Sequence, residues 1–600
     1  MSITNEKTIA ALPSTTRNIG VHLSYDPKSD RIAYASGKSI YLRSVSNPSE
    51  CTQFIGHTYN TTVAKFSPSG FYVASGDESG NVKVWDSVGE DMIVKGDFPI
   101  INGKITDIAW DADSQRIIAV GDGKERYGHC FTYDSGNTIG EISGHSGIIN
   151  AVSIRQSRPY RAATVADDAA LVFLQGPPFK FNSSLRGNHT SFVRDVAFSK
   201  DGAFIVSVGA DRQIVVYDGK TGEFIKKIDS NPHEGGIFAL SWLLEKPDCF
   251  VTSSADGSIK LWNVTSGELL KTWSLERKLE NQILGVISTK DYIIGLTYSG
   301  DLYYFNESTD SPVNVIYGHQ KSITSISKSP ESESGLFTGS YDGRVVSWDL
   351  KEYKASLVEG EGHKNLVVGI VPQKDGSVST AAWDDTVKKI VDGKFVDSSS
   401  VSLENQPVSI TSVDDITVVV TEESLIYFEN LKETKKIALN FTATSVDVSK
   451  SFITVGNAKT NSVAVYDHDL KEVKVLPPLV SKPSFLKISP KEDYLAAGDV
   501  SGKIVCYDLS TFAVKTSRWA FHTAKINSIA WNEDNDHIVS GSLDTNFIVY
   551  SVSKPMRNIK KLNAHKEGVN AVCWIDNKTV ASAGTDAALK LWKVTFPDAS

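Results

Sequence analysis

Twelve histidines are the side chains of this sequence with the greatest capacity for metal binding or acid–base chemistry. Four of them, His22, His129, His468 and His537, are scattered, and no histidine has the spacing of an HExxH metal motif. The others recur at one position of a repeated pattern, so we interpret them as structural: His57, His145, His189, His233, His319, His363, His522 and His565. We therefore expect no metal site and no cofactor.

Two further patterns could suggest catalysis. The Gly-Lys-Ser within residues 35–39 lacks the earlier glycine of a phosphate-binding loop, because that position holds Ile32, and a hairpin turn explains it better. Two carboxylate pairs fall in turns of the repeat, and we expect one member of each to be structural: Asp167-Asp168 and Asp384-Asp385. Spacing alone assigns no nucleophile and base, so we predict that the protein is not an enzyme.

The recurring histidines come with three partner residues. In the best copies a Ser or Thr, an Asp and a Trp follow each histidine at matching distances, which resembles the hydrogen-bonded tetrad of WD repeats. A buried polar chain of this kind is tolerated only when its members are paired. The three sets are His233, Thr252, Asp256 and Trp262; His319, Thr338, Asp342 and Trp348; and His565, Ser582, Asp586 and Trp592. Other repeats lack members, since Ser79 and Ser501 replace the turn Asp and Tyr550 replaces the Trp.

The elements that must position these residues are short β-strands. Runs such as "NVKVWD" and "SIKLWN" end in an aromatic residue with Asp or Asn, and about fourteen copies recur every 40–45 residues or so. Alternating apolar stretches and "SPSG"-type turns lie between them. Each copy predicts a four-stranded antiparallel blade, and propellers close with four to eight blades. We therefore predict an all-β protein of two seven-bladed WD propellers, residues 1–308 and 309–600.

The last repeat ends near Thr595 and needs a fourth strand from elsewhere, because an open edge invites aggregation. Two segments could supply closing strands: residues 6–13 at the amino terminus and residues 312–318 at the boundary. We favour the first closing the first ring and the second closing the second ring. The crossed arrangement is the alternative.

Composition limits the class of protein. The chain has 600 residues and a formal net charge of −9, which argues against nucleic-acid binding. Five scattered cysteines are typical of a reducing compartment. No stretch approaches the ~20 apolar residues of a membrane span, and the apolar run near the amino terminus is too short for a signal peptide. We expect a soluble intracellular protein without membrane insertion.

The most unusual segment is "LQGPPFKFNSS" at residues 174–184, where Leu-Gln replaces the aromatic-Asp ending. Its two prolines suit an edge or a presented loop. Phe179 and Phe181 could be packing residues of an outer strand, or they could form, with Lys180, an exposed site for a protein partner. Strand alternation would place the two phenylalanines on one face and Lys180 on the other. A second candidate is the charged loop "GDGKERYGH" at 121–129, which could also be a plain solvated loop.

Several blocks together resemble the actin-interacting protein 1 family, in a fungal or fungal-like form. They run nearly from end to end, and the combination of the Gly-Pro-Pro-Phe-Lys-Phe block with fourteen repeats is highly specific. The blocks are "HLSYDP" (22–27), "QSRP" (156–159), "QGPPFKF" (175–181), "SFVRDVAFS" (191–199), "GGIFALSW" (235–242), "GSYDGRV" (339–345), "AAGDVSGKI" (496–504) and "TSRWAFHTAKIN" (516–527).

This resemblance implies a function. Members of the family bind actin filaments decorated with cofilin/ADF, promote severing and disassembly, and cap barbed ends, which places them in the cytoplasm at cortical actin patches. It also implies a monomer whose binding surface lies mainly on the first propeller. The implied actin/cofilin-binding residues are Glu125, Arg126, Asp167, Asp168, Phe179, Lys180, Phe181 and Phe192. The alternative is a general WD-repeat scaffold for another protein complex.

Overall fold

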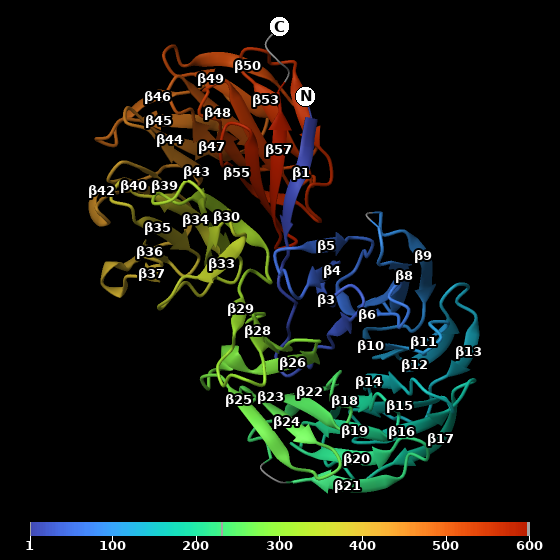
Figure 1. Cartoon of the computed structure of the whole chain (residues 1–600). Coiled ribbons are helices and arrows are strands. Elements are labelled where there is room, and N and C mark those ends of the chain that lie inside the picture. The colour runs from blue at the N-terminus through green and yellow to red at the C-terminus, as the bar shows by residue number, and fades with distance from the viewer. Residues whose placement is uncertain (1, 90, 230–231, 597–600) are drawn as a thin grey trace. The chain divides into compact units, whose positions relative to one another are not determined.

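The computed structural model describes residues 2–89, 91–229 and 232–596. Within these residues the chain forms fourteen antiparallel sheets, and all but one consist of four strands. The chain divides into two compact units, one of residues Leu12–Ile316 and the other of Met1–Ala11 with Tyr317–Ser600. Each unit contains seven of the sheets and is a seven-bladed β-propeller (Figure 1).

The first propeller contains blades 1 to 7. Blade 1 consists of β2 (Ser24–Asp26), β3 (Arg31–Ser36), β4 (Ser39–Ser44) and β5 (Cys51–Phe54), and blade 2 of β6 (Thr61–Phe66), β7 (Tyr72–Asp77), β8 (Asn81–Asp86) and β9 (Val94–Pro99). Blade 3 consists of β10 (Ile105–Trp110), β11 (Arg116–Gly121), β12 (Gly128–Thr132) and β13 (Thr138–Glu141), and blade 4 of β14 (Ile149–Ile154), β15 (Arg161–Ala166), β16 (Leu171–Gln175) and β17 (Lys180–Leu185). Blade 5 consists of β18 (Val193–Phe198), β19 (Phe204–Gly209), β20 (Ile214–Asp218) and β21 (Phe224–Ile228), and blade 6 of β22 (Ile237–Trp242), β23 (Cys249–Ser254), β24 (Ser258–Asn263) and β25 (Leu269–Ser274). Blade 7 consists of β26 (Ile283–Ser288), β27 (Ile293–Thr297), β28 (Leu302–Phe305) and β29 (Asn314–Ile316). A short 3-10 helix at Leu279–Asn281 precedes blade 7.

The second propeller contains blades 8 to 14. Blade 8 consists of β30 (Ile323–Lys328), β31 (Gly335–Ser340), β32 (Val345–Asp349) and β33 (Lys354–Leu357), and blade 9 of β34 (Val367–Pro372), β35 (Val378–Ala382), β36 (Thr386–Val391), β37 (Lys394–Phe395) and β38 (Val401–Ser402). Blade 10 consists of β39 (Pro407–Val413), β40 (Ile416–Thr421), β41 (Ser424–Glu429) and β42 (Lys432–Ala438), and blade 11 of β43 (Ala443–Val448), β44 (Ile453–Asn457), β45 (Ser462–Tyr466) and β46 (Glu472–Val475). Blade 12 consists of β47 (Pro483–Ile488), β48 (Tyr494–Asp499), β49 (Ile504–Asp508) and β50 (Ala513–Trp519), and blade 13 of β51 (Ile526–Trp531), β52 (His537–Ser542), β53 (Phe547–Ser551) and β54 (Asn558–Lys561). Blade 14 consists of β55 (Val569–Trp574), β56 (Thr579–Gly584), β57 (Leu589–Thr595) and β1 (Ser2–Ile9). A second 3-10 helix, Asp397–Ser399, lies between β37 and β38 of blade 9.

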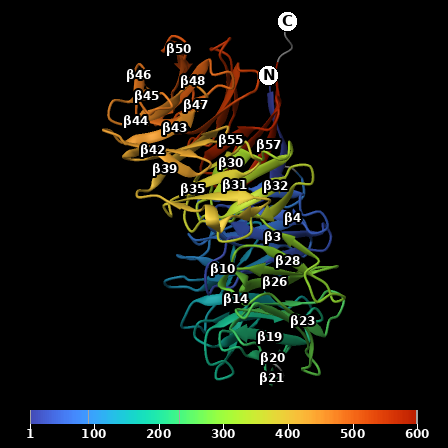
Figure 2. The same ribbon diagram turned by 90° about the vertical axis from the view of Figure 1, so that its left-hand side faces the viewer.

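Within each blade the strands follow one another from the middle of the ring to its rim, as β18 to β21 show in Figure 1 and β19 to β21 in Figure 2. Apolar side chains of neighbouring blades pack together, for example Phe173 of blade 4 with Val196 and Tyr217 of blade 5. Because a sheet of this kind is covered on both sides, its middle strands are buried on both faces, as in β19. This explains the nearly continuous apolar runs of those strands.

Hydrogen bonds between the innermost strands of adjacent blades hold these blades at the same height along the axis of the ring. Asn150 of β14 donates from Nδ2 to the carbonyl oxygen of Val193 in β18 (2.8 Å). In the second propeller Asn570 of β55 donates in the same way to Ile323 of β30 (2.8 Å), which joins the last blade to the first. The second residue of the innermost strand therefore fixes the position of the next blade, so equivalent turns of adjacent blades lie side by side.

The closing strands follow the crossed arrangement. β1 pairs with β57 over a register from Ser2↔Thr595 to Ile9↔Leu589, so the amino terminus completes blade 14 of the second propeller. β29 pairs with β28 and completes blade 7 of the first. The favoured assignment of the two closing strands is therefore wrong, and the units are not residues 1–308 and 309–600. The physical reason is loop entropy: residues 314–316 reach β28 through a short turn, which costs less than pairing with a distant strand.

The polar sets at His233 and His565 form complete tetrads. His233 donates from Nδ1 to Asp256 (3.0 Å) and accepts at Nε2 from the hydroxyl of Thr252 (2.8 Å), which in turn accepts from the indole of Trp262 (2.9 Å). The set of His565, Asp586, Ser582 and Trp592 repeats these bonds at 2.7 to 2.8 Å. These bonds pin the turn between the second and third strands to the loop before the first. We call the end of each ring that carries these turns and loops its tetrad face.

Two sets differ from the sequence prediction. In blade 2 the turn aspartate is not missing, because Asp77, at the end of β7 and two residues before Ser79, accepts from His57 (2.9 Å). In blade 8, His319 bonds Thr338 (2.7 Å), but its Nδ1 has no hydrogen-bond partner among the described residues. Asp342 instead accepts from the hydroxyl of Ser340 (2.5 Å). The tetrad at His319 is therefore only partly formed.

We expect the stability of the second propeller to depend on pH because of its buried histidines. Burial lowers the pKa of His319 to about 3, and the charge of an arginine adds to this effect. In the unfolded chain the same group binds a proton near pH 6.5, so the stabilisation is complete above that pH and is lost as the pH falls towards 3. We expect His319 alone to cost about 2 kcal/mol of unfolding free energy between pH 7 and pH 5. Burial also lowers the pKa of His565, in the same direction.

Urea unfolding at pH 7 and pH 5, followed for the second propeller, tests this prediction. His319→Asn is the matched variant, because it removes the titrating group and should reduce the slope of stability against pH. A stability that does not change between the two pH values would contradict the expectation.

Candidate functional site

The candidate binding residues of the first propeller divide between its two ends. Glu125 and Arg126 lie in the turn between β11 and β12, Asp167 lies between β15 and β16, and Phe192 lies in the loop before β18. All of these belong to the tetrad face of blades 3, 4 and 5, which follow one another around the ring (Figure 1). Phe179, in the turn between β16 and β17, and Lys180, the first residue of β17, lie at the other end of blade 4.

Asp168 is engaged in the fold. It accepts from Nδ1 of His145 (3.1 Å), from the amide of Ser146 (2.9 Å) and from Arg186 (3.2 Å), and its side chain is 6% exposed. Burial alone would raise its pKa, but the bonds from Ser146 and His145 outweigh burial and lower it. Thr164 completes the chain at Nε2 of His145 (2.9 Å), and Leu174 takes the place of the indole. Asp168 therefore holds the turn that presents Asp167.

Asp167 is the outward member of the pair, and the structure adds a partner that the sequence did not identify. Its carboxylate accepts from Asn150 (2.8 Å) and lies 3.9 Å from the guanidinium of Arg194. Arg194 in turn stacks over the ring of Phe192, 5.2 Å from its centre. Burial lowers the pKa of Arg194, and the charge of Asp167 opposes this effect. Asp167, Arg194 and Phe192 thus form one cluster, with 44% of Phe192 exposed.

One donor of Arg194 is unpaired inside the described part of the fold. Its Nε has no hydrogen-bond partner among the described residues, although the side chain is largely buried. Because this Nε is buried it does not reach a partner protein, and Arg194 contributes by holding the exposed ring of Phe192 in place. The block "SFVRDVAFS" contains a signal that could have identified Arg194. The arginine follows Phe192 by two residues and therefore lies on the same side of an extended chain.

Phe179 is not an accessible binding residue. It is 1% exposed and packs with Ile142 and Leu174 in the core between blades 3 and 4. Its ring also lies against Gly176, where an added Cβ would come within 2.6 Å of it. The prediction that Phe179 and Phe181 share a face is wrong, because β17 begins only at Lys180 and alternation does not extend back into the turn.

Lys180 and Phe181 are exposed, with Phe181 47% exposed. They pair with Gln175 and Leu174 in the outermost part of blade 4. The ring of Phe181 reaches along the blade to Gly144, where an added Cβ would come within 2.6 Å of it. Glu125 and Arg126 are exposed as well, and Arg126 lies 3.6 Å from Glu141. The structure therefore leaves these four side chains accessible and removes Phe179 from the set.

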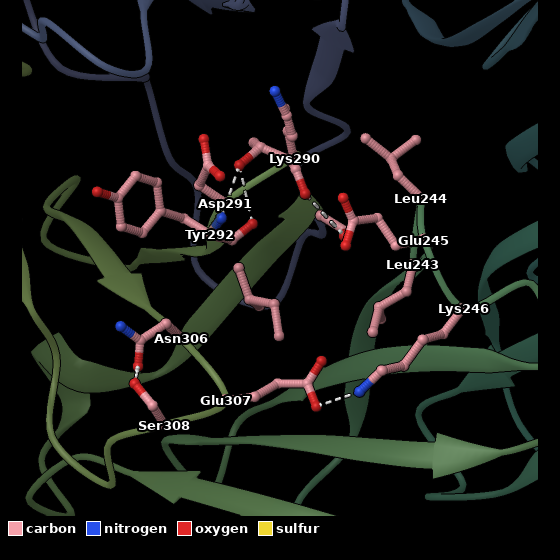
Figure 3. Close-up of a pocket in the computed structure, with 13 residues that line it drawn as sticks. Leu243, Leu244, Glu245, Lys246, Lys290, Asp291, Tyr292, Asn306, Glu307 and Ser308 are labelled. Atoms are coloured by element: carbon pink, nitrogen blue, oxygen red, sulfur yellow. Dashed lines mark hydrogen bonds and ion pairs between the residues drawn. The ribbon is translucent and has the colours of Figure 1, made fainter.

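A pocket of about 270 Å³ lies elsewhere in the first propeller, among the turns of blades 6 and 7 (Figure 3). Lys246 and Glu307 face each other across it and pair at 2.5 Å. Among the lining hydroxyls, Thr289 donates to the carbonyl of Tyr292 and Ser308 to the side chain of Asn306. Neither hydroxyl is bonded to a histidine or carboxylate that could act as its base. The arrangement gives no support for catalysis at this pocket.

Among the described residues, no group of three or more His, Cys, Asp or Glu side chains is placed to hold a metal ion. The described residues also include no helix with the length and apolarity needed to cross a bilayer.

Comparison with known proteins identifies the family. The WD domain, G-beta repeat model matches residues 49–86, 179–218, 223–263, 310–349, 514–551 and 556–593. An uncharacterized WD repeat-containing protein of Schizosaccharomyces pombe is 43% identical over 99% of this chain and 100% of its own length. Actin-interacting protein 1 of Drosophila melanogaster is 34% identical over 98% of both chains, and that of Caenorhabditis elegans is 35% identical over the same shares.

The chain belongs to the actin-interacting protein 1 family. Because the similarity to the two actin-interacting proteins covers nearly all of each chain, both propellers belong to the family pattern. As a member of the actin-interacting protein 1 family, the chain is an actin-related WD-repeat protein.

Proposed function

We propose that this protein binds actin filaments decorated with cofilin/ADF, promotes their severing and disassembly, and caps barbed ends. Two relatives are named actin-interacting protein 1, which supports actin as the partner. The observation that carries the proposal for the binding surface is the cluster of Asp167, Arg194 and Phe192 on the tetrad face of the first propeller.

This cluster suits recognition of a folded polymer. Phe192 offers an exposed ring that Arg194 holds in place, while Asp167 adds negative charge beside it. Glu125 and Arg126, in the equivalent turn of blade 3, extend the charged surface around the ring. Lys180 and Phe181 supply a second contact on the outermost part of blade 4. Aromatic and arginine anchors of this type supply most of the energy in protein interfaces.

A binding preference is sufficient for the proposed activity. A protein that binds cofilin-bearing or severed filaments more tightly than intact ones shifts the population towards the severed state without a chemical step. A hundredfold preference corresponds to about 2.7 kcal/mol. We propose accordingly that the protein is not an enzyme, works as a monomer in the cytoplasm at cortical actin patches, and neither binds nucleic acid nor inserts into membranes.

Co-sedimentation tests the proposal directly. The full chain is mixed with actin filaments, with and without cofilin, and the pellet is compared at equal filament mass. We expect the protein to enter the pellet chiefly when cofilin is present, and the amount of unpelleted actin to increase at the same time. Equal pelleting in both samples would contradict the cofilin requirement, and absence from both pellets would favour a general scaffold for another complex.

A further inference from the structure

The second propeller carries a set of exposed apolar side chains at one structural position. This position is the first residue after the second strand of a blade. The backbone N–H of that residue donates to the carbonyl oxygen of the residue just before the innermost strand. Four residues in this position are large, apolar and exposed: Val500 (38%), Leu543 (51%), Tyr341 (55%) and Trp383 (39%). We call these four residues the rim crescent.

The four residues belong to neighbouring blades. Each is held by the same backbone bond, to Lys482, Lys525, Ser322 and Leu366 respectively, at 2.9 to 3.0 Å. Bonds between innermost strands join blade 12 to 13, 13 to 14, 14 to 8 and 8 to 9. The crescent therefore runs around the tetrad face of the second propeller from blade 12 to blade 9, with Thr585 of blade 14 at its centre.

The surface continues from blade 13 to blade 14. Leu543 lies against Gly568, where an added Cβ would be 3.3 Å from the leucine Cδ1 and 3.5 Å from the hydroxyl of Thr585. Leu543 and Thr585 therefore both border the space above Gly568. In the first propeller the same position holds Glu78, Asp122, Asp167, Ala210 and Ala255, and Tyr298 of blade 7 is partly buried. An exposed apolar series at this position is thus a feature of the second ring.

The charge beside the crescent is positive at one end. Lys482 and Lys525 are exposed, each is the backbone partner of a crescent residue, and no ion pair within the described residues involves either of them. Burial lowers the pKa of Lys525, and the charge of Lys482 lowers it further, so the two ammonium groups act on each other without a neutralising carboxylate. The aromatic end of the crescent, at Tyr341 and Trp383, lies two and three blades away from Lys525.

We propose that the rim crescent binds an acidic segment of a partner protein that carries large apolar side chains. The acidic residues of this segment lie between Lys482 and Lys525, where they replace the missing counter-charges. Its apolar anchors lie along Leu543, Tyr341 and Trp383, which give the exposed aromatic and aliphatic area typical of interface cores. The site is on the second propeller and does not depend on the proposed function of the first.

Peptide selection with the full chain tests this inference. Twelve-residue peptides from a random display library are selected on the immobilised protein, synthesised with a fluorophore and titrated by fluorescence anisotropy. We expect selected sequences to combine Asp or Glu with aromatic or aliphatic residues and to bind more weakly as salt increases. The variants Lys482→Glu with Lys525→Glu, and Leu543→Ser with Trp383→Ser, should each weaken binding at least tenfold.

Matched controls lie on the outermost strand β46 of the same ring, where Val473 is 48% exposed and Lys474 is exposed. Val473→Ser and Lys474→Glu should leave peptide binding unchanged, and thermal unfolding should show that every variant is folded. A selection without a saturable ligand would overturn the proposal. So would a ligand whose affinity is the same for the crescent variants and the wild type.

Discussion

Replacing Phe192 by Ala is expected to reduce cofilin-dependent pelleting with actin filaments at least tenfold while leaving the fold intact. The ring is 44% exposed and its main described contact is the stack with Arg194, so the core loses nothing when it is removed. Removal of an aromatic anchor from an interface costs about 2 kcal/mol or more, which corresponds to about thirtyfold in affinity. The measurement is the concentration of cofilin-decorated filaments that pellets half of the protein.

The control for this variant is Phe224→Ala. Phe224 is 47% exposed in β21 of blade 5, so it matches Phe192 in residue type, exposure and blade but lies on the outermost strand. Its loss should leave pelleting unchanged. Wild-type pelleting by the Phe192 variant would remove the tetrad face of blade 5 from the binding surface. An equal loss in both variants would point to a nonspecific effect of surface hydrophobicity.

Phe179→Ala separates binding from packing in the Pro-Pro segment. Because Phe179 is buried, its truncation should cost about 3 to 5 kcal/mol of unfolding free energy. Lys180→Ala with Phe181→Ala should instead leave stability nearly unchanged and weaken disassembly. Loss of folded protein in the double variant would show that these two exposed residues are needed for the fold.

Deletion of Ser2–Ile9 is expected to destabilise the second propeller and to leave the first unchanged. β1 is the outermost strand of blade 14, where Ile9 is 4% exposed and Ile3 packs against the core of blades 13 and 14. Loss of these two contacts should cost about 3 kcal/mol and lower the unfolding temperature of this unit by about 5 to 10 °C. The deletion also exposes the edge of β57, which carries Leu589 and Leu591, so we expect aggregation on heating.

Differential scanning calorimetry of the full chain and the deletion measures this effect, and a synthetic peptide of residues 1–12 added in trans should partly restore the unfolding temperature. The deletion discriminates between the two possible closures. If the amino-terminal strand closed the first ring, the transition of the first unit would fall instead, and the pairing of β1 with β57 would be refuted.

Much of the fold can be predicted from the sequence because the repeats are local. A histidine, a hydroxyl residue, an aspartate and a tryptophan at fixed spacings specify one blade, as at His233 and His565, and the hydrogen bonds that they form lie within about 30 residues of chain. The number of blades and their division into two rings of seven follow from counting these local units. The aspartate of the blade 2 tetrad is also close in sequence to its histidine, but it is Asp77, two residues before the position at which the sequence pattern predicts it.

Tertiary structure alone decided the features that depend on distant pairing or on the exact start of a strand. The sequence did not determine which ring β1 closes, because both candidate strands alternate similarly and only the relative cost of loop closure separates them. It did not separate Phe179 from Phe181, since alternation applies only inside a strand and β17 begins between them. It did not identify Arg194, whose role depends on the approach of Asp167 from the neighbouring blade. By itself the sequence determined the blades, the structural histidines and the family, because these are set by short-range spacing, whereas contacts between blades required the folded ring.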